Sequence, residues 1–468
     1  MFKLNYLTRI LIAGAFVFAL PAAQANLEAA ERQLTLHDAV QLAIDNDPWQ
    51  SGNQLKRQAL ESQSYAADTL PDPVLSMGLL NLPTNGFAFD QEAMTQLKVG
   101  IAQQFPRGDS RGIRKRQLQQ LAAKHPFLAQ DRSAQIAVTV SQLWLDGYGA
   151  QQSIQLLKQE SRLFEQLAQT VESQYASGQK RTRQEDVIRA NLELARLQDR
   201  LTQLQSDKET ATASLYQWIA NEHFDQSNVG AFDFALNQAV SNEAETNQAE
   251  TAMFPAMTEF VSAPIDRQRF GQLLSKHPAV LALQQTILAG QVGVELAQQK
   301  YQPQWGVNAS YAMRADDQAG QSRADFFSVG VSVDLPLFTH QRQDKAVQAA
   351  KYQAESLKTE KRLLLRNMLS QLESLLSQRQ RLADRLANYD ASILPQMHEQ
   401  AEAELTAYTS NNGDFGEVMQ ARIAELNSRL ERILIATKKQ KVNAHLQYFL
   451  VQANPSDNQQ SKLVLGEQ

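Results

Sequence analysis

Residues 326–335 read Phe-Phe-Ser-Val-Gly-Val-Ser-Val-Asp-Leu, and every odd-numbered position from Phe327 to Leu335 is apolar. The even-numbered positions between them are Ser, Gly, Ser and Asp. Alternation with a period of two predicts a β-strand with one apolar and one polar face. A tilted strand of about 9–11 residues is long enough to cross a bilayer. The stretch is therefore typical of a membrane-spanning strand.

The same alternation recurs three times, so that four strands are expected, at about 73–82, 94–105, 304–313 and 326–335. Polar loops at 83–93 and 314–325 join them in pairs. Aromatic residues, Trp305 among them, gather near the strand ends, as they do at membrane interfaces. A soluble sheet with one face on a core is the alternative interpretation. The polar loops and the aromatic ends favour the membrane.

Four strands are too few to close a barrel. An open sheet edge is not tolerated in lipid, because its backbone groups would lack hydrogen-bond partners. Other copies of the chain must therefore complete the barrel, and the strand count predicts an oligomer.

An internal repeat organises the chain. Pro48, Pro73 and Pro106 recur 230 positions later, as Pro278, Pro303 and Pro336. We therefore expect a first repeat over 26–220 and a second over 267–450. A polar connector, 221–266, separates them, and a polar tail, 451–468, follows.

The first 25 residues have the features of a cleaved signal peptide. Lys3 and Arg9 precede an apolar run from Ile10 to Leu20, and Ala23-Gln24-Ala25 forms a small-x-small cleavage site. The mature protein is therefore expected to be exported.

The composition excludes several classes of protein. The 468 residues include 45 Lys and Arg, 50 Asp and Glu and no Cys, for a net charge of −5. A polytopic helical transporter would need repeated apolar runs of about 18 residues or more. Thiolate chemistry needs cysteine, and nucleic-acid binding needs a basic excess.

Long helices are predicted on either side of the strands. Apolar residues follow a 3-4 spacing over 136–175, 187–218 and 365–393, as in coiled coils. The helical stretch 108–177 would extend roughly 105 Å at 1.5 Å per residue. Pro126 and Pro395 should each kink or break their helix.

The chain resembles the TolC-like outer-membrane efflux proteins over about residues 35–450. The specific elements are the repeat, the strand pairs, the long helices and two hairpin turns, Tyr175-Ala-Ser-Gly178 before Asp186-Val187 and Tyr408-Thr-Ser-Asn-Asn-Gly413 before Glu417-Val418. The resemblance implies a mostly α-helical homotrimer with a twelve-stranded barrel in the Gram-negative outer membrane and a periplasmic helical barrel. It also implies a passive exit channel that works with a periplasmic adaptor and an inner-membrane pump, without catalysis or a cofactor.

Residues 72–78, Asp-Pro-Val-Leu-Ser-Met-Gly, and the stretch 94–107 are most similar to members of heavy-metal resistance-nodulation-division systems. This similarity implies heavy-metal cations as the substrate. A drug, general small-molecule or type I secretion exit duct of the same fold is an alternative. An alternative from another class is a periplasmic coiled-coil scaffold or adaptor.

The family narrows its periplasmic aperture with an Asp-Val-x-Asp pattern. Here the matching positions are Glu417-Val418-Met419-Gln420, so the resemblance implies Glu417 and Gln420 as gate candidates, with Asp186 in the first repeat. The alternative role for Glu417 is an acid stabilised by the helix dipole in a first turn. The resemblance assigns adaptor contacts to the two hairpin turns, at Ser177, Gly178, Asn412 and Gly413.

Basic residues after the second strand, beginning with Arg107 and Arg111, would suit the membrane interface, although such a run is more often a solvated helix face. His398 and Glu402 stand one helical turn apart, but two ligands do not make a metal site. No metal site is therefore predicted.

Overall fold

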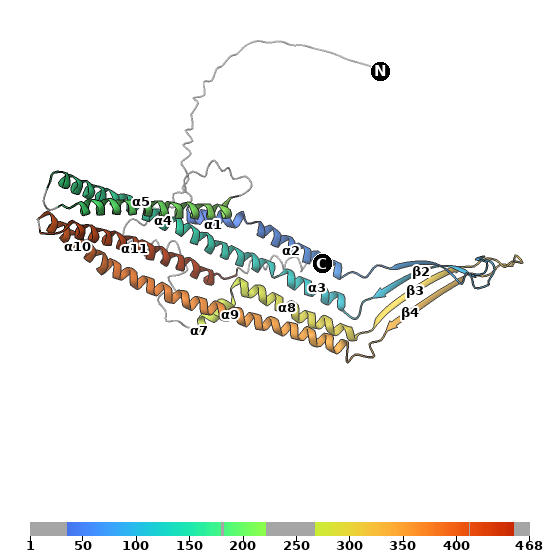
Figure 1. Ribbon diagram of the computed structural model, residues 1–468. Helices are drawn as coiled ribbons and strands as arrows, with labels where there is room; N and C mark the ends of the chain where they lie inside the picture. The colour runs from blue at the N-terminus through green and yellow to red at the C-terminus, as the bar shows by residue number, and fades with distance from the viewer. Residues whose placement is uncertain (1–34, 179–181, 221–266, 411, 454–468) are drawn as a thin grey trace, which may run out of the picture.

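The computed structural model describes residues 35–178, 182–220, 267–410 and 412–453. The signal peptide predicted at 1–25 and the connector at 221–266 lie outside these residues, as does all but the first three residues of the tail. The chain is a long rod with helices along most of its length and a narrow sheet at one end (Figure 1). Two helical hairpins form the opposite end.

The same order of elements occurs twice along the chain. The first half contains α1 (Leu36–Asp45), α2 (Pro48–Ala67), β1 (Val74–Leu80), β2 (Gln96–Phe105), α3 (Ser110–Ala122), α4 (His125–Ala176) and α5 (Gln184–Ile219). The second contains α7 (Arg267–Ser275), α8 (Pro278–Gln298), η4 (Gln299–Tyr301), β3 (Gln304–Met313), β4 (Phe326–Asp334), α9 (Gln343–Asn388), a π-helical turn (Tyr389–Ile393), α10 (Leu394–Thr409) and α11 (Phe415–Leu450). The predicted fold of two tandem repeats, with four strands and long helices, is confirmed.

The four strands form one antiparallel sheet in the order β1-β2-β3-β4. Its register aligns odd-numbered residues with odd-numbered residues on every strand. One row across the sheet is Met77, Val99, Tyr311 and Phe327. The apolar residues therefore share one face of the sheet.

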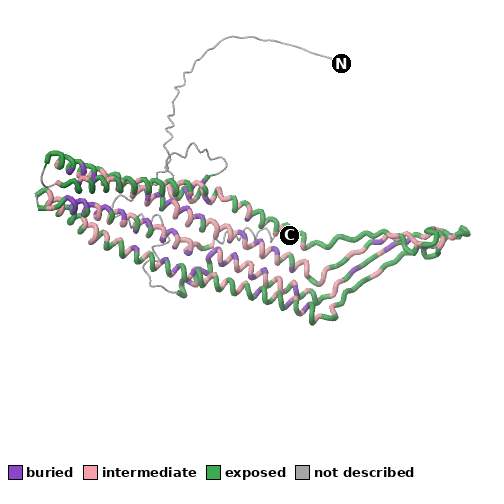
Figure 2. Tube along the Cα trace, in the orientation of Figure 1, coloured by how far each residue is buried: buried purple, intermediate pink, exposed green. Residues whose placement is uncertain are grey.

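Burial is inverted between the sheet and the helices (Figure 2). On the apolar face Leu75, Met77 and Phe327 are each 71% exposed. Among the helices, Val140 and Trp144 are fully buried. In the helical part, apolar side chains are thus removed from water. In the sheet they form an outer surface suited to lipid.

Three apolar clusters hold the helices together. One joins α7, α8, α9 and α11 around Leu274 and Leu372. A second joins α4, α5 and α11 around Phe164 and Met419, near the hairpin end. The third packs α1 against α4 and α5 around Trp144. The apolar residues that follow the 3-4 spacing in the sequence pack together in these clusters.

Prolines interrupt the helices in two ways. Pro126 stands at the second position of α4, after a two-residue break from α3, so the single helix expected over 108–177 is two helices. Pro48 likewise opens α2. Pro395 follows the π-helical turn 389–393. Proline has no backbone N–H to donate to the preceding turn, and the π-helical turn accommodates the missing hydrogen bond without ending the helix.

Pro48 and Pro278 occupy equivalent positions in the two repeats, but the helix-capping residues that precede them are chemically different. The carboxylate of Asp47 caps α2 and is ion-paired with Arg132 at 2.9 Å. At the matching position, Nδ1 of His277 accepts from the backbone N–H of Ala279 at 3.2 Å. Nε2 of His277 lies 2.9 Å from the carbonyl oxygen of Tyr448, to which it can donate. Burial lowers the pKa of His277, which keeps the ring neutral and Nδ1 able to accept.

One stretch among the described residues, Pro278–Tyr301, is a helix long and apolar enough to cross a membrane. The sequence reasoning above overlooked it. In the structure this stretch, which begins with α8, packs against α3, α9 and α4 as part of the helical bundle. Only 22% of its apolar window is buried by these contacts.

Candidate functional site

The hairpin end is the first candidate site, and its α4–α5 turn is built on Gly178. This residue has φ +72°, a conformation that glycine adopts without strain. Its N–H donates to the carbonyl oxygen of Tyr175 at 3.0 Å, and that of Ser177 donates to Ser173 at 3.0 Å. The turn is therefore a helix C-terminus closed by glycine.

The α10–α11 turn needs glycine for a different reason. A Cβ on Gly413 would lie 2.8 Å from the backbone nitrogen of Tyr408, which leaves no room for a side chain. The N–H of Asn412 donates to the carbonyl oxygen of Ala407 at 2.8 Å. Close backbone approach, not a positive φ, therefore selects Gly413.

One amide joins the two hairpins. Oε1 of Gln174 in α4 accepts from the hydroxyl of Tyr408 in α10 at 2.6 Å. The same oxygen accepts from the hydroxyl of Thr182, just before α5, at 3.2 Å. The Tyr408 ring also packs edge-on against Phe415 of α11, with ring centres 5.9 Å apart. The two turns are thus parts of one connected tip.

The two acidic gate candidates have different surroundings. Asp186 is 7% exposed and accepts from the backbone N–H of Arg183 at 2.9 Å, so it caps α5. Glu417 is exposed in the first turn of α11, where Asp414 supplies the cap. Of the two acids, Glu417 is therefore the one whose side chain is exposed.

Gln420, the third gate candidate, lies in a groove between α5 and α11. Ile188 and Leu192 of α5 line the same groove and are 59% and 48% exposed. Gly416 also borders it, and a Cβ there would collide with the guanidinium of Arg189. On the α5 side the groove is mostly charged, with Ile188 and Leu192 between charged residues, whereas on the α11 side Gln420 lies between apolar residues.

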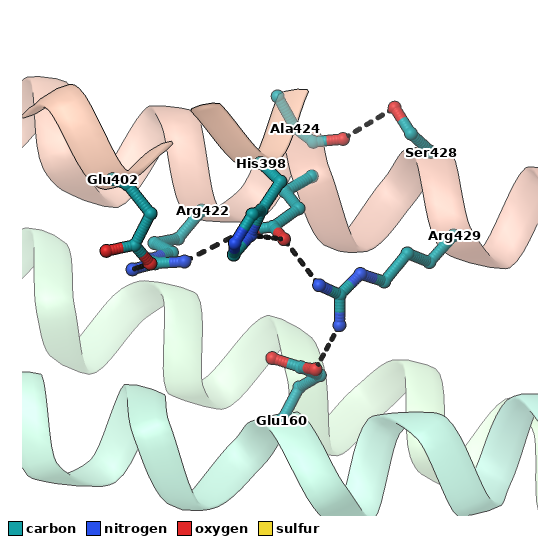
Figure 3. Close-up of polar contacts among 8 residues, drawn as sticks. Glu160, His398, Glu402, Arg422, Ala424, Ser428 and Arg429 are labelled. Atoms are coloured by element: carbon teal, nitrogen blue, oxygen red, sulfur yellow. Dashed lines mark hydrogen bonds and ion pairs between the residues drawn. The ribbon is translucent and has the colours of Figure 1, made fainter. Parts of the chain in front are cut away.

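A charged network crosses the second hairpin behind its turn (Figure 3). Arg422 of α11 binds Glu402 of α10 at 2.5 Å and Glu425 at 3.0 Å. Arg429 binds Glu425 at 2.5 Å and Glu160 of α4 at 2.8 Å. The network thereby links three helices.

Glu425 is the centre of this network. Its side chain is 6% exposed, and Nδ1 of His398 lies 2.9 Å from its Oε1. Burial alone would raise the pKa of Glu425, but hydrogen bonds from His398 and Arg422 and the charge of Arg429 outweigh it. The pKa therefore lies below its ordinary value.

Sequence reasoning paired His398 with Glu402 and missed the residues that bind them. In the structure both side chains turn toward α11, where His398 contacts Glu425 and Glu402 contacts Arg422. Among the described residues, no group of three or more histidine and acidic side chains is placed to hold a metal ion. The spacing of Arg422, Glu425 and Arg429 was the available signal.

The residues assigned to the membrane interface lie where the helices meet the sheet. Arg107 forms an ion pair with Asp334 at the end of β4 and donates to the carbonyl oxygen of Gln302 at 2.8 Å. Arg111 donates to the carbonyl oxygen of Asp68 at 3.0 Å. Trp305 is 50% exposed on the apolar face, in register with Phe105. Arg107 therefore joins segments of the two repeats, whereas Arg111 joins α3 to the end of α2 within the first repeat.

Solved structures of bacterial outer-membrane channels share this arrangement. CusC, described as forming a transmembrane channel, matches with a TM-score of 0.69 and 14% identity over 90% of this chain and 92% of its own. The outer-membrane protein VceC of Vibrio cholerae matches at 0.68 and 13% identity, over 89% and 96% of the two chains. The outer-membrane channel CmeC of Campylobacter jejuni matches at 0.68 and 13% identity, over 91% and 89%.

No protein-family model matches the chain. A search of curated protein sequences likewise found no match. The structural matches extend over nearly the whole chain on both sides, so the TolC-like outer-membrane channel fold predicted by the resemblance is confirmed. At such low identity the likeness concerns the fold.

Proposed function

We propose that this protein is an outer-membrane exit channel, through which solutes delivered by an inner-membrane pump and a periplasmic adaptor leave the cell. The observation that carries the proposal is the sheet, whose apolar face is exposed while its helical neighbours bury theirs. Such a sheet suits a barrel wall between lipid and a water-filled lumen. The channel is passive, and the proposal assigns it no catalytic residue and no cofactor.

The channel is proposed to be a homotrimer. Within the described part of the chain β1 and β4 each pair with one strand only. In lipid those free edges need partners, and β4 of one copy beside β1 of the next would supply them. Three copies of a four-stranded sheet give the twelve strands that the resemblance implies.

The gate is assigned to the hairpin end. Glu417 from three copies would form an acidic ring that concentrates cations at the periplasmic entrance. The ion pairs of Arg422 and Arg429 brace α10 and α11 and tie α11 to α4, so the two hairpins are expected to move together when an adaptor docks at the turns.

Conductance in a planar lipid bilayer tests the channel and its gate. Purified protein should form conducting pores, and Glu417→Ala should weaken their preference for cations, whereas Glu417→Asp keeps the charge and the preference. Protein that never conducts would point instead to a periplasmic scaffold. Pores whose selectivity is the same in all three proteins would remove Glu417 from the gate.

Heavy-metal cations remain the substrate hypothesis drawn from residues 72–78 and 94–107. A deletion strain should then become hypersensitive to zinc, cobalt, cadmium, copper or silver salts. Hypersensitivity to dyes, detergents and antibiotics, with normal metal tolerance, would make the protein a general drug exit and reject the metal hypothesis.

A further inference from the structure

Resting on the proposed trimeric channel, we propose that Lys98 sets an anion preference in the outer part of the barrel. Lys98 is the third residue of β2, which begins just after the loop at the far end of the rod from the helical hairpins. Three copies would place a ring of ammonium groups around the lumen. None of the gate residues predicted from the sequence lies in this part of the molecule.

The sheet register places Lys98 on the face opposite the apolar rows. Its partners across the sheet are Gly78 on β1 and Ala312 on β3, both even-numbered. The adjacent rows on β2 are the apolar ones, in which Leu97 pairs with Leu79 and Val99 with Met77. When the apolar face contacts lipid, Lys98 must face the lumen.

Among the strand residues, Lys98 is the one ionisable group of this face that lacks an ion pair. The other, Asp334, stands at the helical end of β4 and is bound by Arg107. The ammonium of Lys98 forms neither a hydrogen bond nor an ion pair with any other residue that the structure describes, and the residue is only partly buried. Its positive charge is therefore not neutralised within the protomer.

The surroundings of Lys98 leave its ammonium accessible. Glycine and alanine flank it across the sheet, and the next row inward consists of Ser76, Gly100, Ser310 and Ser328. The one bulky side chain of these two rows, Phe326, stands on β4, two strands away from Lys98. The charge therefore projects from a wall of small residues into the space that a passing solute would occupy.

A second cation strengthens the field on this face. Arg314 immediately follows β3, and its guanidinium stacks 4.0 Å from the ring centre of Phe326, an even-numbered residue of β4 that pairs with Ala312. Its side chain donates to the backbone carbonyl oxygens of Ala93 and Ala324. The carboxylate of Asp325 accepts from the hydroxyl of Tyr311, a residue of the apolar rows, and from the backbone N–H of Arg314 at 3.0 Å. Lys98 and Arg314 thus place two positive charges per copy near this end of the sheet, while the acids Asp90, Glu92, Asp316 and Asp317 belong to the loops beyond the strands.

A ring of fixed charge in a pore with a low-dielectric wall attracts counter-ions and repels co-ions. The outer barrel should therefore favour chloride over potassium, and organic anions over free divalent cations. The acidic ring proposed at Glu417 would act in the opposite sense at the other end. A metal cation leaving through this channel would pass the Lys98 ring most readily as an anionic or neutral complex.

Reversal potentials across a planar bilayer, measured in a potassium chloride gradient, test the inference. In Lys98→Gln the chloride-to-potassium permeability ratio should fall by roughly twofold or more, and Lys98→Glu should lower it further. Lys98→Arg keeps the charge and should keep the wild-type ratio. Trimer migration on gels and helical circular dichroism establish that each variant is folded.

The outcomes separate this inference from the proposed function. Conducting pores whose permeability ratio is unchanged in both Lys98→Gln and Lys98→Glu would overturn the inference but not the proposed channel function. Wild-type protein that forms no pores would overturn both. A ratio that also changes in Lys98→Arg would show that side-chain shape, not charge, governs permeation, and would likewise overturn the inference.

Discussion

Phe327 in the sheet exposes 71% of its surface, whereas Phe164 in α4 exposes 1%. The two residues are chemically identical and are held in regular secondary structure, yet only the helical one has other side chains around it. In water, such exposed apolar rows across four strands would be an aggregation hazard. This contrast indicates that the apolar face of the sheet suits a second solvent, lipid, whereas the helices have an ordinary protein core.

Deleting the two phenylalanine rings should expose this difference most strongly. Phe164→Ala removes a buried ring from the α4, α5 and α11 cluster and should lower the free energy of unfolding by about 3–5 kcal/mol. Phe327→Ala removes the same atoms from a lipid-facing surface. Thermal melts of the helical signal in detergent should show a large loss of Tm for the first and little for the second. Equal losses would contradict the division into two solvents.

Charge substitutions on the two faces of the sheet should separate membrane insertion from folding. Val331→Arg puts a cation on the apolar face, where it should cost about 2–4 kcal/mol per chain near the bilayer centre. Gln104→Arg puts the same cation on the opposite face. Flotation with liposomes should show that Val331→Arg fails to insert and Gln104→Arg inserts. Insertion of both variants would mean that the apolar rows do not face lipid.

Acid should weaken the helical end before the sheet. The pKa of Glu425 lies below its ordinary value of 4.5, so its ion pairs stabilise the folded state above that pH and are lost as the pH falls through and below it. Glu425→Gln should lower the stability at pH 7 by about 1–3 kcal/mol. It should also flatten the decline of Tm toward about pH 4. A decline as steep as in the wild type would place the acid sensitivity elsewhere.

The strands and their faces could be predicted because a period of two depends only on neighbours along the chain. The alternation around Val329 and Val331 carries that information without any knowledge of tertiary contacts. The need for other copies of the chain followed from the same count of strands. Helix identity could likewise be predicted from the 3-4 spacing.

The network around Arg422 could not be predicted in the same way. Glu402 and Arg422 are 20 positions apart, and their contact depends on the length and geometry of the turn at Gly413. The break before Pro48 likewise depends on a side-chain contact, because the carboxylate of Asp47 accepts from the backbone N–H of Trp49 and starts a new helix. Asp186 could be singled out from the sequence, but only the structure shows that its carboxylate caps α5.

Because the sheet has two open edges, at β1 and β4, the extent of assembly also depends on the concentration of the chain. A chain with a lipid-suited face and no closed barrel is stable neither in water nor in lipid, so its stability cannot be separated from the concentration of its copies. If the assembly is the proposed trimer, its amount should rise with about the third power of the chain concentration while assembled copies are scarce. A modest fall in expression would then remove most of the channels while leaving many chains, exposed to periplasmic proteases.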